Sequence, residues 1–209
     1  MAGRGDAMLW TVANGVTAGR IVMVIVFAVS PPSFSSLAVL LLSFILDLVD
    51  GMLARRLGQT SKLGAILDIL ADNLGRSAVW AKASGRSASV HAFAVFFISL
   101  EWVTLFATQM TSHLEGGRHW KQQTSEEPWM VRAYFKNNFK NPLGTSGILG
   151  LFLLPTYIFI DSQFPSIASS FPPSLWLLVG VWLLLGRLAS ACLEMYFTIR
   201  FFRRLLSPS

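Results

Sequence analysis

Charged residues and cysteine are scarce in this chain of 209 residues. Asp, Glu, Lys and Arg make up 13% of it, against about a quarter in an ordinary soluble domain. The single cysteine, Cys192, excludes an intrachain disulfide and a site built from several thiolates. The three histidines have no metal-ligand spacing, and we expect them at the surface: His91, His113 and His119. A metal site in this chain would therefore use oxygen ligands.

Apolar residues dominate what remains, at 53% of the chain. Several apolar runs approach the roughly 20 residues needed to cross a bilayer, which a soluble protein of this size could not bury. The net charge of +6 does not indicate nucleic-acid binding, because the basic residues lie between apolar segments, as in other helical membrane proteins. No small-residue cleavage site follows the N-terminal residues, so we expect no removed signal peptide.

The sequence predicts an all-α integral membrane protein, a single domain over residues 1–209 with a six-transmembrane-helix bundle. Pro31-Pro32 ends the first predicted helix, and Gly58 is a plausible end for the second. We also expect parts of the polar stretch 111–140 to lie on the membrane surface, because it contains Trp120, Trp129 and Tyr134. The predicted spans are about 14–30, 35–57, 61–83, 90–110, 143–160 and 175–202.

The distribution of Lys and Arg predicts the orientation of these spans. With six spans, twelve of the 17 basic residues lie on the side that holds both termini, whereas only Lys82 and Arg86 lie on the other. Three arginines fall within spans: Arg20, Arg76 and Arg187. The positive-inside rule therefore predicts cytoplasmic termini and a cytoplasmic loop between the second and third spans.

Four aspartates lie in the second and third predicted spans, within 26 residues of sequence: Asp47, Asp50, Asp68 and Asp72. Carboxylates inside a membrane are rare and require a partner. The first two are three residues apart and the last two are four apart, so each pair occupies one helix face. Antiparallel neighbouring helices can therefore present all four to one volume, at the cytoplasmic side of helices 2 and 3.

Carboxylates without His or Cys suit hard cations, namely Mg²⁺, Mn²⁺ or Ca²⁺. Four carboxylates could bridge two Mg²⁺ or Mn²⁺ ions, an arrangement used for displacement at phosphorus. Three small residues would leave room for a phosphate, and Arg55 supplies a cation suited to a diphosphate. Two alternatives remain open at this point: helix packing by the small residues, and a proton or sodium path along the aspartates. The small residues are Gly51, Ala54 and Gly64.

The pattern Asp-x2-Asp-Gly-x2-Ala-Arg-x8-Gly-x3-Asp-x3-Asp, from Asp47 to Asp72, resembles the signature of the CDP-alcohol phosphatidyltransferases at all eight fixed positions. The segment Asn14-Gly15-Val16-Thr17 with Arg20 also resembles the first helix of that family. The resemblance implies that an alcohol hydroxyl attacks the lipid-side phosphorus of a CDP-linked lipid and that CMP leaves.

The resemblance also implies roles for the motif residues. Asp47, Asp50, Asp68 and Asp72 would bind Mg²⁺ or Mn²⁺, as two ions, and Asp72 would be the catalytic base. The nucleotide and CDP-lipid site would be shaped by Gly51, Ala54, Arg55 and Gly64. The partners would be CDP-diacylglycerol, a small alcohol and the lipid bilayer, and a homodimer is expected from the resemblance alone.

Within the family, the motif region is most similar to the eukaryotic phosphatidylinositol synthases, which implies myo-inositol as acceptor and the endoplasmic reticulum as location. Two positions depart from that branch: Asn73 follows the last aspartate where Arg is usual, and the fourth span carries Glu101. We take Glu101 as a candidate acceptor-binding residue, the alternative being a structural pair with a buried base. Arg187 and Glu194 are interpreted as structural.

Two other functions stay open on the sequence alone. The same chemistry could act on another acceptor, such as glycerol 3-phosphate, for which basic loop residues could supply a cationic pocket. A non-catalytic membrane protein or a divalent-cation carrier is the alternative from a different class.

Overall fold

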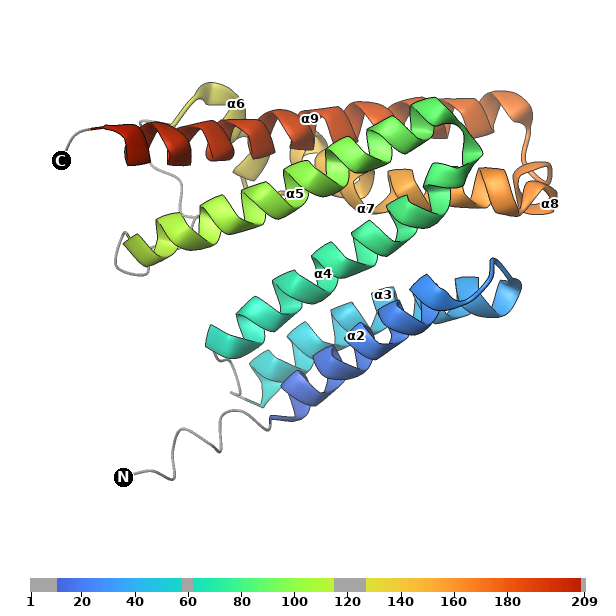
Figure 1. Cartoon of the computed structure of the whole chain (residues 1–209), viewed down its shortest axis with the longest axis horizontal. Helices are drawn as coiled ribbons and strands as arrows, with labels where there is room; N and C mark the ends of the chain where they lie inside the picture. The colour runs from blue at the N-terminus through green and yellow to red at the C-terminus, as the bar shows by residue number, and fades with distance from the viewer. Residues whose placement is uncertain (1–10, 58–61, 115–126, 208–209) are drawn as a thin grey trace. The chain divides into compact units, whose positions relative to one another are not determined.

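The computed structural model describes residues 11–57, 62–114 and 127–207, apart from the side chains at 48, 50, 51, 53–55, 62 and 114. Within this part of the chain every regular element is a helix, and six helices have 18 or more residues (Figure 1). These six match the predicted segments to within four residues at each end. The predicted all-α fold is therefore confirmed.

The chain divides into two compact units, Met1–Lys82 and Ala83–Ser209. The first contains α2 (Val12–Val29), α3 (Phe34–Arg56) and α4 (Lys62–Ala83), the last residue of which begins the second unit. The second contains η1 (Ser84–Arg86), α5 (Ala88–Leu114), α6 (Trp129–Phe135), α7 (Pro142–Gln163), α8 (Pro165–Ala168) and α9 (Pro173–Leu206). The single domain over 1–209 stays a prediction.

Helix-capping residues and two prolines determine where α2 ends and α3 begins in the first unit. The Thr11 hydroxyl caps α2 by accepting from the Asn14 backbone N–H at 3.1 Å. The helix stops before Pro31-Pro32, as predicted. Ser33 and Ser36 then cap the start of α3 reciprocally, since each hydroxyl accepts from the other's backbone N–H. The predicted end of α3 at Gly58 lies outside the described residues.

Side chains of α2 also meet those of α4 in order along both helices. Arg20 contacts Asp72, and Val24 lies 3.6 Å from where a Cβ on Gly75 would be. Further along α2, Phe27 lies beneath the Lys82 ammonium, 5.1 Å from nitrogen to ring centre. Because the contacts advance together, α2 and α4 run parallel. This pairing fixes which face of α4 meets Arg20.

Glycines allow α7 and α9 to approach closely in the second unit. A Cβ on Gly150 or Gly186 would lie less than 3.0 Å from the backbone of the opposing helix. Larger residues would force the helices apart, so this is small-residue packing of the kind found between membrane helices. The predicted fifth span continues through Pro155, which is buried within α7.

The short helix α6, which the sequence did not predict, is held against α9. Val131 and Tyr134 of α6 form a buried cluster with Leu193. Glu127, just before the helix, accepts a hydrogen bond from Tyr196 at 2.6 Å and forms an ion pair with Arg200. Part of the polar stretch is therefore ordered on the C-terminal helix.

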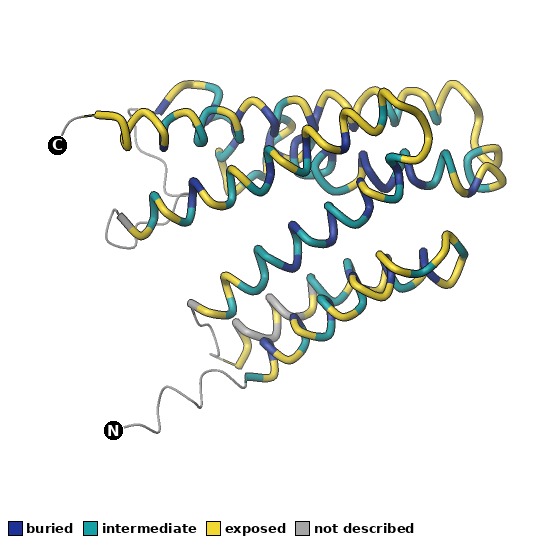
Figure 2. The backbone as a smooth tube through the Cα atoms, viewed as in Figure 1, coloured by how far each residue is buried: buried dark blue, intermediate teal, exposed yellow. Residues whose placement is uncertain are grey.

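Four helices of the described chain are long and apolar enough to cross a membrane, namely α2, α5 up to His113, α7 and α9. Helix α3 has a shorter apolar part, Phe34–Asp47. Exposed positions occur along all of the long helices (Figure 2). Many of them carry apolar side chains, for example Val22, Phe106 and Leu178. Apolar surface on this scale is unusual for a protein surrounded by water, and it supports a multi-pass membrane protein.

Candidate metal centre

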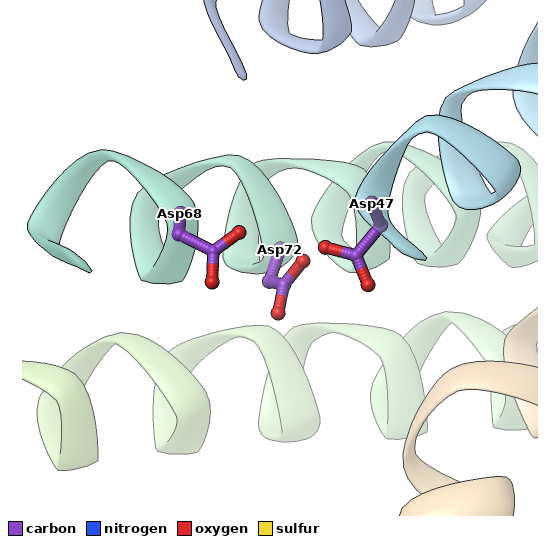
Figure 3. Close-up of side chains that lie close together, drawn as sticks. All are labelled: Asp47, Asp68 and Asp72. Atoms are coloured by element: carbon purple, nitrogen blue, oxygen red, sulfur yellow. The ribbon is translucent and has the colours of Figure 1, made fainter. Parts of the chain in front are cut away.

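Three of the four predicted aspartates come together in the first unit. Asp47 extends from α3, and Asp68 and Asp72 extend from one face of α4 toward it (Figure 3). One oxygen from each carboxylate lies within 4.8 Å of the others. The spacing of four residues on α4 produces this arrangement, because residues i and i+4 are neighbours on a helix surface.

Arg20 of α2 forms ion pairs with all three carboxylates. Its Nη2 lies 2.7 Å from Asp47 Oδ1 and 2.8 Å from Asp72 Oδ1, and its Nη1 lies 2.9 Å from Asp68 Oδ1. The Arg20 side chain is only 4% exposed, whereas those of Asp47, Asp68 and Asp72 are 32%, 47% and 24% exposed. The guanidinium therefore reaches the cluster from the protein interior, and the aspartates keep an accessible side.

The cluster fits a small divalent cation. Opposite ligands of Mg²⁺ lie about 4.2 Å apart, given metal–oxygen distances of about 2.1 Å, so small side-chain movements would bring these oxygens into range. The donors are all carboxylate oxygens, which such ions prefer. Three carboxylates and one guanidinium also carry a net charge of −2 when ionised, which would attract a divalent ion.

The structure describes only some of the other predicted site residues. The side chains of Asp50, Gly51, Ala54 and Arg55 lie outside the described residues. Gly64 lies in the first turn of α4, four residues before Asp68. The ligand role of Asp50 and the nucleotide-binding roles of Gly51, Ala54, Arg55 and Gly64 stay predictions.

Glu101 belongs to a separate buried ion cluster in the second unit. The fully buried Arg187 of α9 donates to Glu101 Oε1 of α5 at 3.0 Å and to Glu194 Oε2 at 2.9 Å. The Phe97 ring lies 4.1 Å from the guanidinium carbon. The pairing of Glu101 with a buried base, which was the alternative left open by the sequence, is thus observed, and the base is Arg187. Its role in acceptor binding stays a prediction.

Sequence reasoning did not place Arg20 in the aspartate cluster. A partial signal was available, since an arginine within a predicted span needs an acidic partner, but the spacing does not show which acids it meets. Asn73, which departs from the inositol branch, is buried and accepts a hydrogen bond from the buried Arg76 one turn further along α4. His91 and His113 are exposed, as predicted, and His119 lies outside the described residues.

The described residues combine membrane-length apolar helices with a cluster of carboxylates, which defines a membrane protein with a candidate site for a hard cation. A family model described as CDP-alcohol phosphatidyltransferase matches residues 10–193. The chain belongs to this family, which confirms the resemblance of the motif and supports an enzyme of this class. The match extends over parts of both compact units.

One curated relative is the CDP-diacylglycerol–inositol 3-phosphatidyltransferase of Schizosaccharomyces pombe, which is 31% identical over 103 residues. The aligned region covers 48% of this chain and 42% of the relative, so less than half of each protein is compared. No solved structure matches the chain significantly.

We predict that Arg187→Met lowers the free energy of unfolding by about 3 kcal/mol, because it leaves Glu101 and Glu194 without their buried cation. Thermal or denaturant unfolding of the protein in detergent measures the change. Arg86→Met is the matched control: its pair with Asp161 is exposed at the arginine, so a loss below about 1 kcal/mol is expected. Equal losses in the two variants would contradict a structural role for the buried cluster.

Proposed function

We propose that this protein transfers a phosphatidyl group from CDP-diacylglycerol to myo-inositol and releases CMP. The observation that carries the proposal is the cluster of Asp47, Asp68 and Asp72, whose oxygens lie within 4.8 Å of one another. Family membership supports the reaction class. The acceptor is suggested by the relative named as an inositol phosphatidyltransferase, over the part of the chain that aligns.

Asp47, Asp68 and Asp72, together with Asp50, would hold Mg²⁺ or Mn²⁺, as two ions. When bound, such ions would neutralise negative charge on the diphosphate. Gly51, Ala54, Arg55 and Gly64 would shape the site for the CDP group. In this proposal the aspartates would hold the ions at the accessible side of the cluster, where the reacting diphosphate would bind.

Asp72 is the proposed base. Arg20 contacts its carboxylate through Oδ1, and the Asp72 side chain is 24% exposed, which leaves room for a hydroxyl to approach it. The acceptor hydroxyl gives its proton to Asp72 as its oxygen bonds to the lipid-side phosphorus. The bond from that phosphorus to the bridging oxygen breaks, and CMP leaves with the electron pair.

We further propose that all six long helices span the membrane of the endoplasmic reticulum, with both termini cytoplasmic. Helices α3 and α4 have 23 and 22 residues, enough to cross a bilayer. Their carboxylates lower their hydropathy, but Arg20 offsets part of that charge. The active site would then open at the cytoplasmic side, where the basic residues concentrate.

A panel of acceptors tests the proposed reaction. Purified protein with Mn²⁺ and CDP-diacylglycerol should release CMP at least tenfold faster with myo-inositol than with glycerol 3-phosphate. CMP release with glycerol 3-phosphate alone would overturn the acceptor but keep the chemistry. Movement of Mn²⁺ across vesicles without any CMP would instead indicate a carrier.

Asp72→Asn should abolish transfer, lowering CMP release at least a thousandfold, because the amide cannot accept the hydroxyl proton. Asp161→Asn is the matched control, since Asp161 lies in α7 of the other unit, and it should keep activity close to that of the unmodified protein. The thermal midpoint of each variant shows whether it is folded. A folded Asp72→Asn variant with near-normal turnover would exclude Asp72 as the base.

A further inference from the structure

Arg20 lies where a divalent ion would be expected in the aspartate cluster. Its guanidinium nitrogens are 2.7–2.9 Å from oxygens of Asp47, Asp68 and Asp72, which come from two different helices. The side chain starts on a third helix, α2, and is nearly fully buried. One arginine therefore joins all three helices of the first unit through the predicted metal ligands.

A divalent ion and this guanidinium would be bound by the same three carboxylates. Without any cation, three carboxylates this close would repel one another, most strongly in surroundings of low dielectric constant. With both cations present, the positive charges would repel each other. Arg20 can therefore hold the cluster together in the absence of metal.

We propose that Arg20 is a resident cation of the cluster, which holds Asp47, Asp68 and Asp72 together in the metal-free protein and competes with the divalent ion for their oxygens. The inference rests on the proposed metal site. It makes Arg20 a positioning residue that acts through the aspartates. A divalent ion must then displace the bound guanidinium, which costs free energy. The protein therefore binds the ion more weakly than the three carboxylates would without Arg20.

Competition predicts two changes of opposite sign when the charge of Arg20 is removed. The metal-free protein should become less stable, because the three carboxylates lose their common partner. The affinity for Mn²⁺ should rise, because no cation has to be displaced. If Arg20 only supports the fold, removing its charge should lower the stability of the metal-free protein, and the affinity for Mn²⁺ should fall or stay the same.

The test is a titration of the full-length protein in detergent with Mn²⁺, without nucleotide, in which free Mn²⁺ is measured by electron paramagnetic resonance. Arg20→Gln should bind Mn²⁺ at least tenfold more tightly than the unmodified protein, which is about 1.4 kcal/mol. Its thermal midpoint should be lower without metal and should rise more on addition of Mn²⁺. Should Arg20→Gln require Mn²⁺ during purification, Arg20→Lys keeps one charge and should show an intermediate affinity.

Lys82→Gln is the matched control, because it also removes one positive charge from the first unit. Lys82 lies ten residues after Asp72, which is about 15 Å along α4. Its Mn²⁺ affinity should not change. Unchanged or weaker binding in Arg20→Gln and Arg20→Lys would overturn the competition. Absence of Mn²⁺ binding in the unmodified protein would instead overturn the metal site on which the inference rests, so the two failures are distinguishable.

Discussion

Like-charged carboxylates in apolar surroundings must be balanced by a cation, and this requirement organises the first half of the molecule. Asp47, Asp68 and Asp72 meet because α3 and α4 carry them on facing surfaces, and Arg20 of α2 satisfies one oxygen of each. The pairing of α2 with α4 continues through Val24 and Phe27. The same side chains that hold three helices together thus prepare the oxygens on which the proposed chemistry depends.

In the second half of the molecule a cation also balances clustered carboxylates, but there the charged side chains are largely buried. Arg187 is fully buried and is shared by Glu101 and Glu194, against the face of Phe97. The aspartates around Arg20 are partly exposed, whereas Arg187 is fully buried. In the proposal made above, this exposure is what lets the aspartates exchange one cation for another. The exposure of the carboxylates is therefore what distinguishes the proposed metal site from the cluster around Arg187.

Much of the helical layout could be predicted from the sequence, because apolar length and the Pro31-Pro32 break are local signals. The spacing of the motif also predicted the meeting of Asp47, Asp68 and Asp72. The participation of Arg20 could not be read from local spacing, since it depends on α2 lying parallel to α4. Helix α6 was missed because its order comes from packing on α9 and from Glu127 contacting Tyr196. The partner of Glu101 likewise depends on the register of α5 against α9.

The most direct measurement is the position of Mn²⁺ in an experimental structure of the protein bound to CDP-diacylglycerol, located by anomalous scattering. We expect at least one Mn²⁺ peak in direct coordination with Asp47, Asp68 and Asp72, and the guanidinium of Arg20 withdrawn from at least one of these carboxylates. A structure with the lipid bound, Arg20 still joined to all three aspartates and no Mn²⁺ among them would contradict it.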